Sequence, residues 1–412
     1  MPISTFRVIN LILFLVLILS SCEQEPLMVE DENLSLSSDT ITFNVVDDIT
    51  YQIPPNMSGS KYLYIGKRDN YEFDVNYIRI NKFSVNRYDP FNGDTIVSEF
   101  HNYSTSSLTV DSLKLSLNFI NDSIDTDAQF YLRYFPDAPD SVFSRSRTNY
   151  LNNNTNYSDI ISYGTILEDT SSSYATLSFS IDTSHFSEFI DTSLVGFNNS
   201  FLIGANNAEQ GFYEFFSMNN GENTSPSLSI FFKYILNDST VIDTFNVHNA
   251  TEDLAILKPP SLAENDTSYL SVSLAKGLKS LFAIDTKEWQ LPKGSVIRKA
   301  ELLLSSVDND SSNSSIINSY PLKGDLLPKK FSFFENDPFD LDIPNGSSSA
   351  MNNNQLKLNH RLGSTNFFNT NKSLHIFNIQ PNITNDPFTT INFHNSNHIE
   401  LFPKFRIIYV IP

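Results

Sequence analysis

Apolar residues that alternate with polar ones at a period of two dominate this sequence. In segment 110–117, Leu113, Leu115 and Leu117 are separated by Lys114 and Ser116, which is the spacing of a strand with one buried face. Beyond the apolar N-terminal segment, no stretch of ten residues keeps a clean helical period. The segment 186–190 would make one helical turn at most. The pattern therefore predicts an all-β protein.

Clusters of Asn, Asp, Ser and Gly separate these strand-like segments and supply the turns. Segments 83–88 and 95–103 read as two strands joined through Asn92-Gly93, a dipeptide typical of tight hairpins. We expect this hairpin to be an insertion in the first half of the chain.

Five segments recur in the same order in the two halves of the chain. The tetrapeptide at 42–45 returns at 244–247, and the closing segment 226–232 matches 403–409. The other matched pairs are 61–65 with 268–272, 77–81 with 281–285, and 110–117 with 297–304. A repeat of this kind predicts two copies of one unit. We place them at 40–236 and 237–412, each an antiparallel β-sandwich of jelly-roll type.

The N-terminus has the order of a secretory signal. Arg7 is followed by nine apolar residues, Leu11–Leu19, and then by Ser20-Ser21-Cys22. A helix that crosses a bilayer needs about 20 apolar residues, so this segment predicts a cleaved signal peptide at 1–21. The run Leu19–Cys22 resembles the lipobox of bacterial lipoproteins, which implies that Cys22 is acylated and becomes the mature N-terminus. The alternative is an uncleaved anchor followed by a buried cysteine.

The segment 22–39 is acidic and has no sustained period, which is typical of a flexible tether. Glu23 and Glu25 resemble the acidic surface-export tract of some Gram-negative lipoproteins. Together these features predict a lipid-anchored protein of the bacterial outer membrane or cell surface, with the membrane as a partner through the lipid.

Composition narrows the classes of function. The formal net charge of −20 argues against binding to nucleic acid and against adsorption to anionic lipid through a basic patch. Cys22 is the only cysteine, so its acylation would leave no thiol for a disulfide or a metal site. The 34 Phe and 18 Tyr beside one Trp favour strands.

Residues 281–285 (LFAID) and 291–302 (LPKGSVIRKAEL) resemble the signature of the DNRLRE-type module. Segment 403–409 matches the closing strand of that family well, and 226–234 matches it loosely. The first copy lacks the Leu-Pro-x-Gly-Ser turn, and the second has Leu278-Lys279 where the family has an arginine. The resemblance implies a β jelly roll of extracellular proteins, some of which are carbohydrate-binding modules. Segment 110–117 is also similar to uncharacterised surface lipoproteins of related β architecture.

Candidate chemistry is sparse in this sequence. It contains no Gly-x-Ser-x-Gly elbow and no phosphate-binding glycine loop. His394 and His398 have a metal-ligand spacing but lie in an expected turn, so we do not predict a metal there.

Asp308 and Asp310 begin a segment like a Ca²⁺ loop, without its glycine and closing Glu. We favour a solvated acidic turn there, and a structural Ca²⁺ is the alternative. Another oxygen-rich turn contains the three acids Asp337, Asp340 and Asp342.

Trp289 is the single Trp and precedes an expected turn. It is the candidate for stacking on a sugar, and the alternative is that it covers one end of the core. The aromatic doublets 215–216, 231–232 and 333–334 are expected to be buried.

These observations predict a non-enzymatic surface lipoprotein that binds a ligand or acts as a scaffold. The family resemblance implies that the ligand is a polysaccharide. One alternative is a structural subunit of a surface assembly that docks a protein partner. A third is a polysaccharide-degrading enzyme, which would need converging Tyr, His and Arg or paired acids on a concave face.

Overall fold

The architecture is almost entirely β, as the sequence predicts. The computed structural model describes residues 37–411 except 82, 89–94, 100–107, 121–127, 137–138, 154–158, 169–173, 191–197, 207–210, 222–223, 237–239, 261–267, 308–314 and 361–373. The helical elements within these ranges are single turns: α2 (Pro139–Val142), α3 (Phe186–Phe189), and the 3₁₀ turns η2 (Thr183–His185), η4 (Met218–Asn220) and η5 (Ile343–Asn345). The turn α3 coincides with the brief helical pattern noted in the sequence. None of the described helices is long and apolar enough to cross a membrane.

Eleven of the described strands form one sheet. Its main order is β11-β2-β3-β10-β7-β8-β9-β6-β12-β13, and β14 pairs with β3. The bounds are β2 (Tyr62–Arg68), β3 (Tyr71–Asn81), β6 (Leu108–Ile120), β7 (Gln129–Phe135), β8 (Ile160–Glu168), β9 (Tyr174–Ile181), β10 (Asn198–Asn206), β11 (Phe212–Phe216), β12 (Ser227–Leu236), β13 (Thr240–Asn249) and β14 (Glu252–Lys258). Strand β11 also pairs with β6, so the sheet curls into a barrel-like body around an aromatic core that includes Phe179, Phe201 and Phe232.

The second sheet contains ten strands in the part of the chain that the structure describes. Its main order is β19-β18-β21-β16-β1-β23-β17-β20, and β15 pairs with β16 and β22. The bounds are β1 (Ser37–Gln52), β15 (Tyr269–Ser273), β16 (Leu278–Asp285), β17 (Val296–Ser305), β18 (Ile316–Pro321), β19 (Ser347–Ala350), β20 (Gln355–His360), β21 (Leu374–Pro381), β22 (Thr390–His394) and β23 (Lys404–Ile411). Its core includes Phe282, Phe377 and Phe405, all buried.

A separate two-stranded sheet consists of β4 (Ser84–Tyr88) and β5 (Thr95–Glu99), paired antiparallel. This pairing confirms the predicted hairpin, although its Asn92-Gly93 turn lies outside the described residues.

The two large sheets share the arrangement of strands around their closing strands, β12 and β23. In each, the closing strand lies between a strand from the repeat 110–117 or 297–304 and an N-terminal repeat strand. The registers agree as well. Leu113 lies opposite Ile230 and Leu115 opposite Leu228 in the first sheet, while Ala300 lies opposite Ile407 and Leu302 opposite Phe405 in the second. The sequence match of 110–117 with 297–304 therefore places equivalent residues at equivalent positions.

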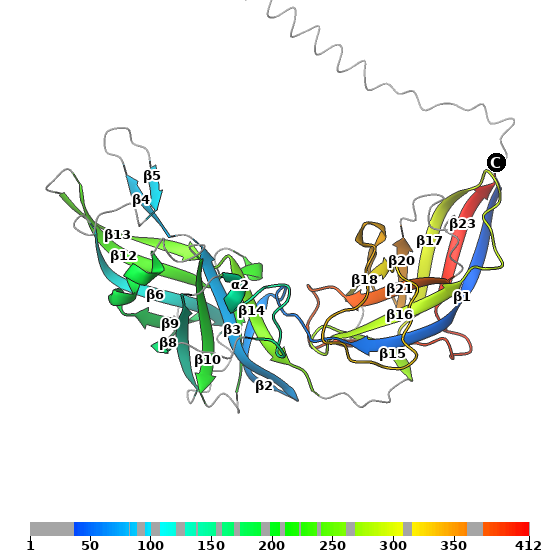
Figure 1. The fold of residues 1–412 in the computed structure, drawn as a ribbon, viewed down its shortest axis with the longest axis horizontal. Helices are drawn as coiled ribbons and strands as arrows, with labels where there is room; N and C mark the ends of the chain where they lie inside the picture. The colour runs from blue at the N-terminus through cyan, green and yellow to red at the C-terminus, as the bar shows by residue number, and fades with distance from the viewer. Residues whose placement is uncertain are drawn as a thin grey trace, which may run out of the picture.

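The first strand of the chain belongs to the second sheet. β1 pairs with the closing strand β23 through residues 37–44 and with β16 through 45–52, and Figure 1 shows the blue β1 beside the red β23. Conversely, β13 pairs with β12, and β14 pairs with β3, both within the first sheet. The sheets thus do not follow the boundaries of 40–236 and 237–412.

The tetrapeptides 42–45 and 244–247, in contrast, pair with their closing strands in different registers. Phe43 lies opposite Phe405 of β23. Leu228, the counterpart of Phe405 in the first sheet, lies opposite His248 rather than Phe245. The tetrapeptides therefore occupy equivalent strands but are offset by three residues along them.

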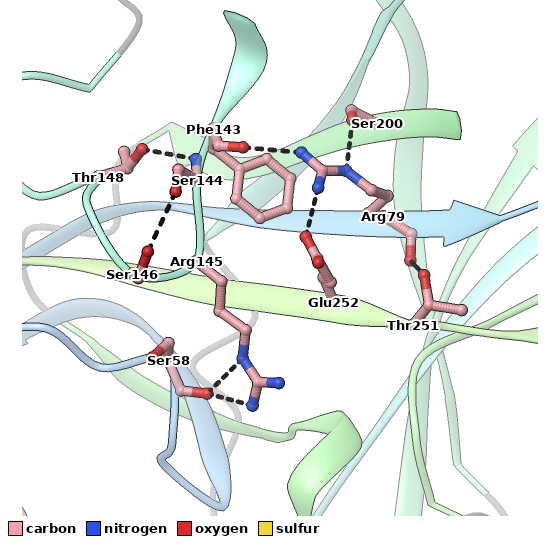
Figure 2. A network of polar contacts seen from close by, with 10 residues as sticks. All are labelled: Ser58, Arg79, Phe143, Ser144, Arg145, Ser146, Thr148, Ser200, Thr251 and Glu252. Atoms are coloured by element: carbon pink, nitrogen blue, oxygen red, sulfur yellow. Dashed lines mark hydrogen bonds and ion pairs between the residues drawn. The ribbon is translucent and has the colours of Figure 1, made fainter. Parts of the chain in front are cut away.

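A buried arginine ties β14 to β3 (Figure 2). Arg79 of β3 is 5% exposed and forms an ion pair with Glu252 of β14. Its Nη2 donates to the carbonyl of Phe143 at 2.7 Å, and its guanidinium carbon lies 4.3 Å from the centroid of that ring. Its Nε also faces the hydroxyl of Ser200, at 3.5 Å. The single guanidinium group therefore joins β3, β14 and the loop that carries Phe143.

The same loop contacts the segment that leads from β1 into the first sheet. Arg145 donates from Nε and Nη2 to the carbonyl of Ser58, at 3.0 and 2.6 Å, as Figure 2 shows. Nη2 also donates to the side-chain oxygen of Asn219, at 2.8 Å. The chain is thereby held at the point where it passes from one sheet to the other.

Phe388, in the loop before β22, packs against the first sheet. Its ring lies 5.3 Å from that of Tyr71 and 5.5 Å from that of Tyr64, centroid to centroid. Leu274 and Ala275 of the second half join the same core cluster. These aromatic and apolar contacts join the two bodies, which lie side by side along the long axis of the molecule (Figure 1).

Candidate functional site

Two adjoining depressions lie on the outer side of the second sheet, along β17. The first has a volume of about 640 Å³ and is lined by Arg298, Lys299, Lys357, Asn359 and the serines 347–349. The second has a volume of about 270 Å³, and its lining includes Lys357, Lys404 and Arg406. Because Lys357 lines both, we treat them as one feature and call it the β17 groove.

The strand registers explain why cations gather in this groove. Lys357 of β20 and Lys404 of β23 both lie opposite Leu303 of β17. Arg406 lies opposite Glu301, and side chains two residues apart on a strand share a face. The alternate residues of β23, Phe405 and Ile407, are buried in the core. Burial of these apolar residues therefore turns the cations of β17, β20 and β23 outward together.

One carboxylate lies beneath these cations. Glu301 is 2% exposed. Its Oε1 accepts a bond from Lys299 Nζ at 3.0 Å, and its Oε2 accepts one from Arg406 Nε at 2.8 Å. Burial would raise the pKa of Glu301, but the hydrogen bonds and charges of Lys299 and Arg406 outweigh it and lower that pKa. Glu301 is thus ionised and holds the two cations in place.

The other cations of the groove are not neutralised in this way. Within the described part of the chain, Arg298 and Lys357 form no ion pair, and both residues are exposed. The ammonium of Lys404 lies 4.4 Å from the ring centroid of Phe402 and also lacks a carboxylate partner there. The groove can therefore attract anionic groups and donate hydrogen bonds to them.

The sequence patterns described above do not predict this groove. The only local signal is a basic residue at outward positions of three strands, at 299, 357, and 404 with 406. These strands are separated by up to about a hundred residues of sequence, and the overall charge of −20 conceals a local excess of cations. The signal becomes visible only when β17 is placed between β20 and β23.

Trp289, the predicted sugar-stacking residue, lies outside this groove. It is half-buried, with its ring centroid 5.6 Å from that of Phe43 and 5.7 Å from that of Tyr409. These contacts with β1 and β23 place it against the second core, the arrangement described by the alternative interpretation.

The remaining predicted site residues are not brought together. Cys22, Asp308 and Asp310 lie outside the described residues, so their predicted roles stay predictions. Among the residues that the structure does describe, no cluster of three His, Cys, Asp or Glu side chains is arranged to hold a metal ion.

The acids of the second oxygen-rich turn bind separate partners. Asp337 forms an ion pair with Lys279 at 2.8 Å, whereas Asp340 pairs with Lys323 at 3.0 Å. Asp342 accepts a hydrogen bond from the side chain of Asn345.

His394 and His398 do lie close together, with ring centroids 4.1 Å apart. The Nδ1 of His398 accepts backbone N–H groups of Glu400 and Leu401, at 3.3 and 3.0 Å. Burial and the neighbouring His398 lower the pKa of His394. One ring nitrogen of His398 is thus committed to the turn that follows it.

The aromatic doublets are only partly buried, and the expectation is wrong for Phe333, which is 42% exposed. Phe215, Phe216 and Phe232 are buried as expected, whereas Phe231 is 36% exposed and stacks on exposed Phe245 with centroids 5.4 Å apart. The expectation for Phe231 is therefore wrong, because it lies on the outward side of β12. Together with Ile235, Val241 and Val247, the two rings form an exposed apolar patch that we call the β13 patch.

Comparisons with known proteins add no identification. No protein-family model matches the chain, and no curated protein matches its sequence. The resemblance to the DNRLRE-type module stays a prediction based on the residues quoted above.

Proposed function

We propose that this protein is a non-enzymatic, lipid-anchored surface protein of a bacterial outer membrane that binds polysaccharide through the β17 groove. The observation that carries the proposal is the groove itself. Its volume is within the range of about 300–1,000 Å³ that ligand sites occupy. Its lining combines charged side chains with the amide of Asn359 and the serines of β19, which are suitable partners for sugar hydroxyls.

We further propose that the two barrel-like bodies are related jelly rolls. The support is the matched strand order and the shared register of β6–β12 and β17–β23. On this view, the first body comprises about residues 53–258, and the second combines β1 with residues 268–411. The exchange of first strands between the copies would then explain why sequence repeats and sheets divide the chain differently.

A glycan array tests the proposed ligand class. The full-length protein in detergent should bind at least one polysaccharide, and Lys357→Ala should weaken that binding. Lys330→Ala is the matched control, because Lys330 is an exposed lysine outside the groove lining. Binding to no glycan would contradict the proposal, and so would an equal loss in both variants.

A second candidate function is a structural subunit that docks a protein partner. The observation in its favour is the β13 patch, because β13 forms one end of the main strand order and exposes Phe245 by 56% and Val241 by 60%. A stoichiometric protein that co-purifies with the wild type and is lost on Phe245→Ser would favour this function over glycan binding.

Lipid anchoring is tested separately. Cys22→Ser should leave unprocessed precursor and abolish fatty-acid labelling of the chain. Unchanged processing and membrane partitioning would refute the anchor without affecting the binding proposal.

A further inference from the structure

We infer that the β17 groove takes a linear polysaccharide that carries carboxylate or sulfate groups. The inference rests on the proposed function and deepens it by naming the charge and the form of the ligand. It starts from the imbalance of charge on this face. Among the described residues of its lining, five are cations, at 298, 299, 357, 404 and 406, and one, Glu400, is a carboxylate.

The buried carboxylate of Glu301 does not cancel this imbalance. It engages only Lys299 and Arg406, through opposite oxygens. Bidentate neutralisation of one acid by two cations still leaves a net positive charge. Arg298 and Lys357 are exposed, Lys404 is half-buried beside Phe402, and none of the three has a carboxylate partner in the described residues. Long cationic side chains facing solvent are suited to binding anions that arrive from outside.

The length of the groove favours a polymer over a single small anion. Its lining extends along β17 from Ile297 to Ser305. Because a bulge lies between Ile297 and Lys299, this range advances seven steps of the ladder, or about 23 Å. Lys357 and Lys404 are separated by two strand spacings, or about 10 Å, across β17. Cations distributed over such distances can contact several charged units of one extended chain at once.

The uncharged groups of the lining favour sugar over other anionic polymers. Asn359, Gln355 and Ser349 offer both donors and acceptors, which match hydroxyl groups. A duplex nucleic acid or an anionic bilayer presents a much broader charged surface. The remaining surface of a chain with a net charge of −20 would repel such a surface.

A matched pair of polymers tests the inference on the full-length protein in detergent. Dextran sulfate is the sulfated probe, unmodified dextran is its neutral counterpart, and polygalacturonate is the carboxylate probe. Affinity for dextran sulfate or polygalacturonate should exceed that for dextran at least tenfold. It should also fall at least tenfold between 50 and about 500 mM salt, because salt screens exposed charges.

Two double variants locate the binding. Lys357→Ala with Lys404→Ala should weaken binding to the anionic probe at least tenfold. Lys329→Ala with Lys330→Ala removes the same charge from an exposed segment outside the groove lining and should change the affinity less than twofold. Thermal unfolding of both variants at the wild-type temperature confirms that the comparison concerns binding.

The outcomes separate the inference from the proposed function. Binding of neutral glycans that is lost on Lys357→Ala, with no preference for the anionic probes, would overturn the inference and leave the proposed function intact. Failure to bind any polysaccharide would overturn both. Stronger binding to vesicles of phosphatidylglycerol or to single-stranded DNA than to either anionic polysaccharide would also overturn the inference. An equal loss in the two double variants would show that the charge acts without a defined site.

Discussion

The guanidinium carbon of Arg68 lies 4.5 Å from the ring centroid of Phe388. Arg68 ends β2 of the first sheet, whereas Phe388 lies in a loop of the second. The ring also contacts Tyr64, Tyr71, Phe73 and Phe212, so one side chain is held by five residues of the other body. A cation above a ring and aromatic edges around it each stabilise such a contact by about 0.5–1.5 kcal/mol.

We expect Phe388→Ala to uncouple the two bodies without unfolding either of them. Small-angle X-ray scattering should show a larger radius of gyration and a broader distribution of distances than the wild type. Phe333→Ala is the control, because Phe333 is 42% exposed. Unchanged scattering by Phe388→Ala would show that other contacts determine the arrangement of the bodies.

We expect substitution of Arg79 to lower the free energy of unfolding substantially. Its side chain is 6% exposed and that of its partner Glu252 is 35% exposed. Removal of one partner from a buried ion pair costs about 3–5 kcal/mol, and the partial exposure of Glu252 favours the lower end. Arg79→Met should therefore lower the free energy of unfolding in urea by about 3 kcal/mol.

A surface pair provides the control for Arg79. Lys258 and Glu72 form an ion pair at 3.1 Å, with side chains 58% and 36% exposed. Lys258→Ala should lower the free energy of unfolding far less than Arg79→Met does, because exposed ion pairs contribute little to stability. Equal effects of the two substitutions would contradict a structural role for the Arg79 network.

Because of His360, we expect the folded protein to lose stability in acid. His360 is 5% exposed and contacts the ring of Phe377 at 4.8 Å, centroid to centroid. Burial lowers its pKa to about 4, outweighing a hydrogen bond to the carbonyl of Asn345. Below about pH 6.5 the unfolded chain gains a proton that the folded chain does not, so stability falls as the pH drops toward 4. The loss from this group is about 3 kcal/mol.

The variant His360→Phe isolates this contribution. Its stability relative to the wild type should increase from pH 7 to pH 4 in urea unfolding. The comparison is needed because burial raises the pKa of Asp253 to about 6, which makes stability rise as the pH drops through the same range. A difference between His360→Phe and wild type that does not vary with pH would contradict the assignment.

Substitution of Trp289 distinguishes packing of this residue against the core from binding of a sugar. Because its ring packs on Phe43 and Tyr409, Trp289→Ala should lower the free energy of unfolding by about 2 kcal/mol. Affinity for the groove ligand should be unchanged. Trp289 is the only Trp, so its fluorescence reports on this position alone. A shift in its emission on adding polysaccharide, or a loss of affinity that Trp289→Phe restores, would support sugar stacking instead.

The sequence by itself determined the class of local structure. Alternation in 110–117 and 228–232 marks which side chains are buried, and Leu113, Leu115 and Phe232 are indeed buried. The turn dipeptide Asn92-Gly93 likewise predicted the pairing of β4 with β5. These features are local, because strand alternation and hairpin turns depend on neighbouring residues.

Only the tertiary structure decided which strands are neighbours. The tetrapeptide 42–45 belongs to a sequence repeat, yet nothing in it specifies that Phe43 pairs with Phe405 near the other end of the chain. The β17 groove also depends on which strands pair. Lys357 and Lys404 lie on either side of Leu303 only because β20 and β23 both pair with β17. Periodicity specifies the face of a strand, whereas long-range packing of the whole core selects its partner.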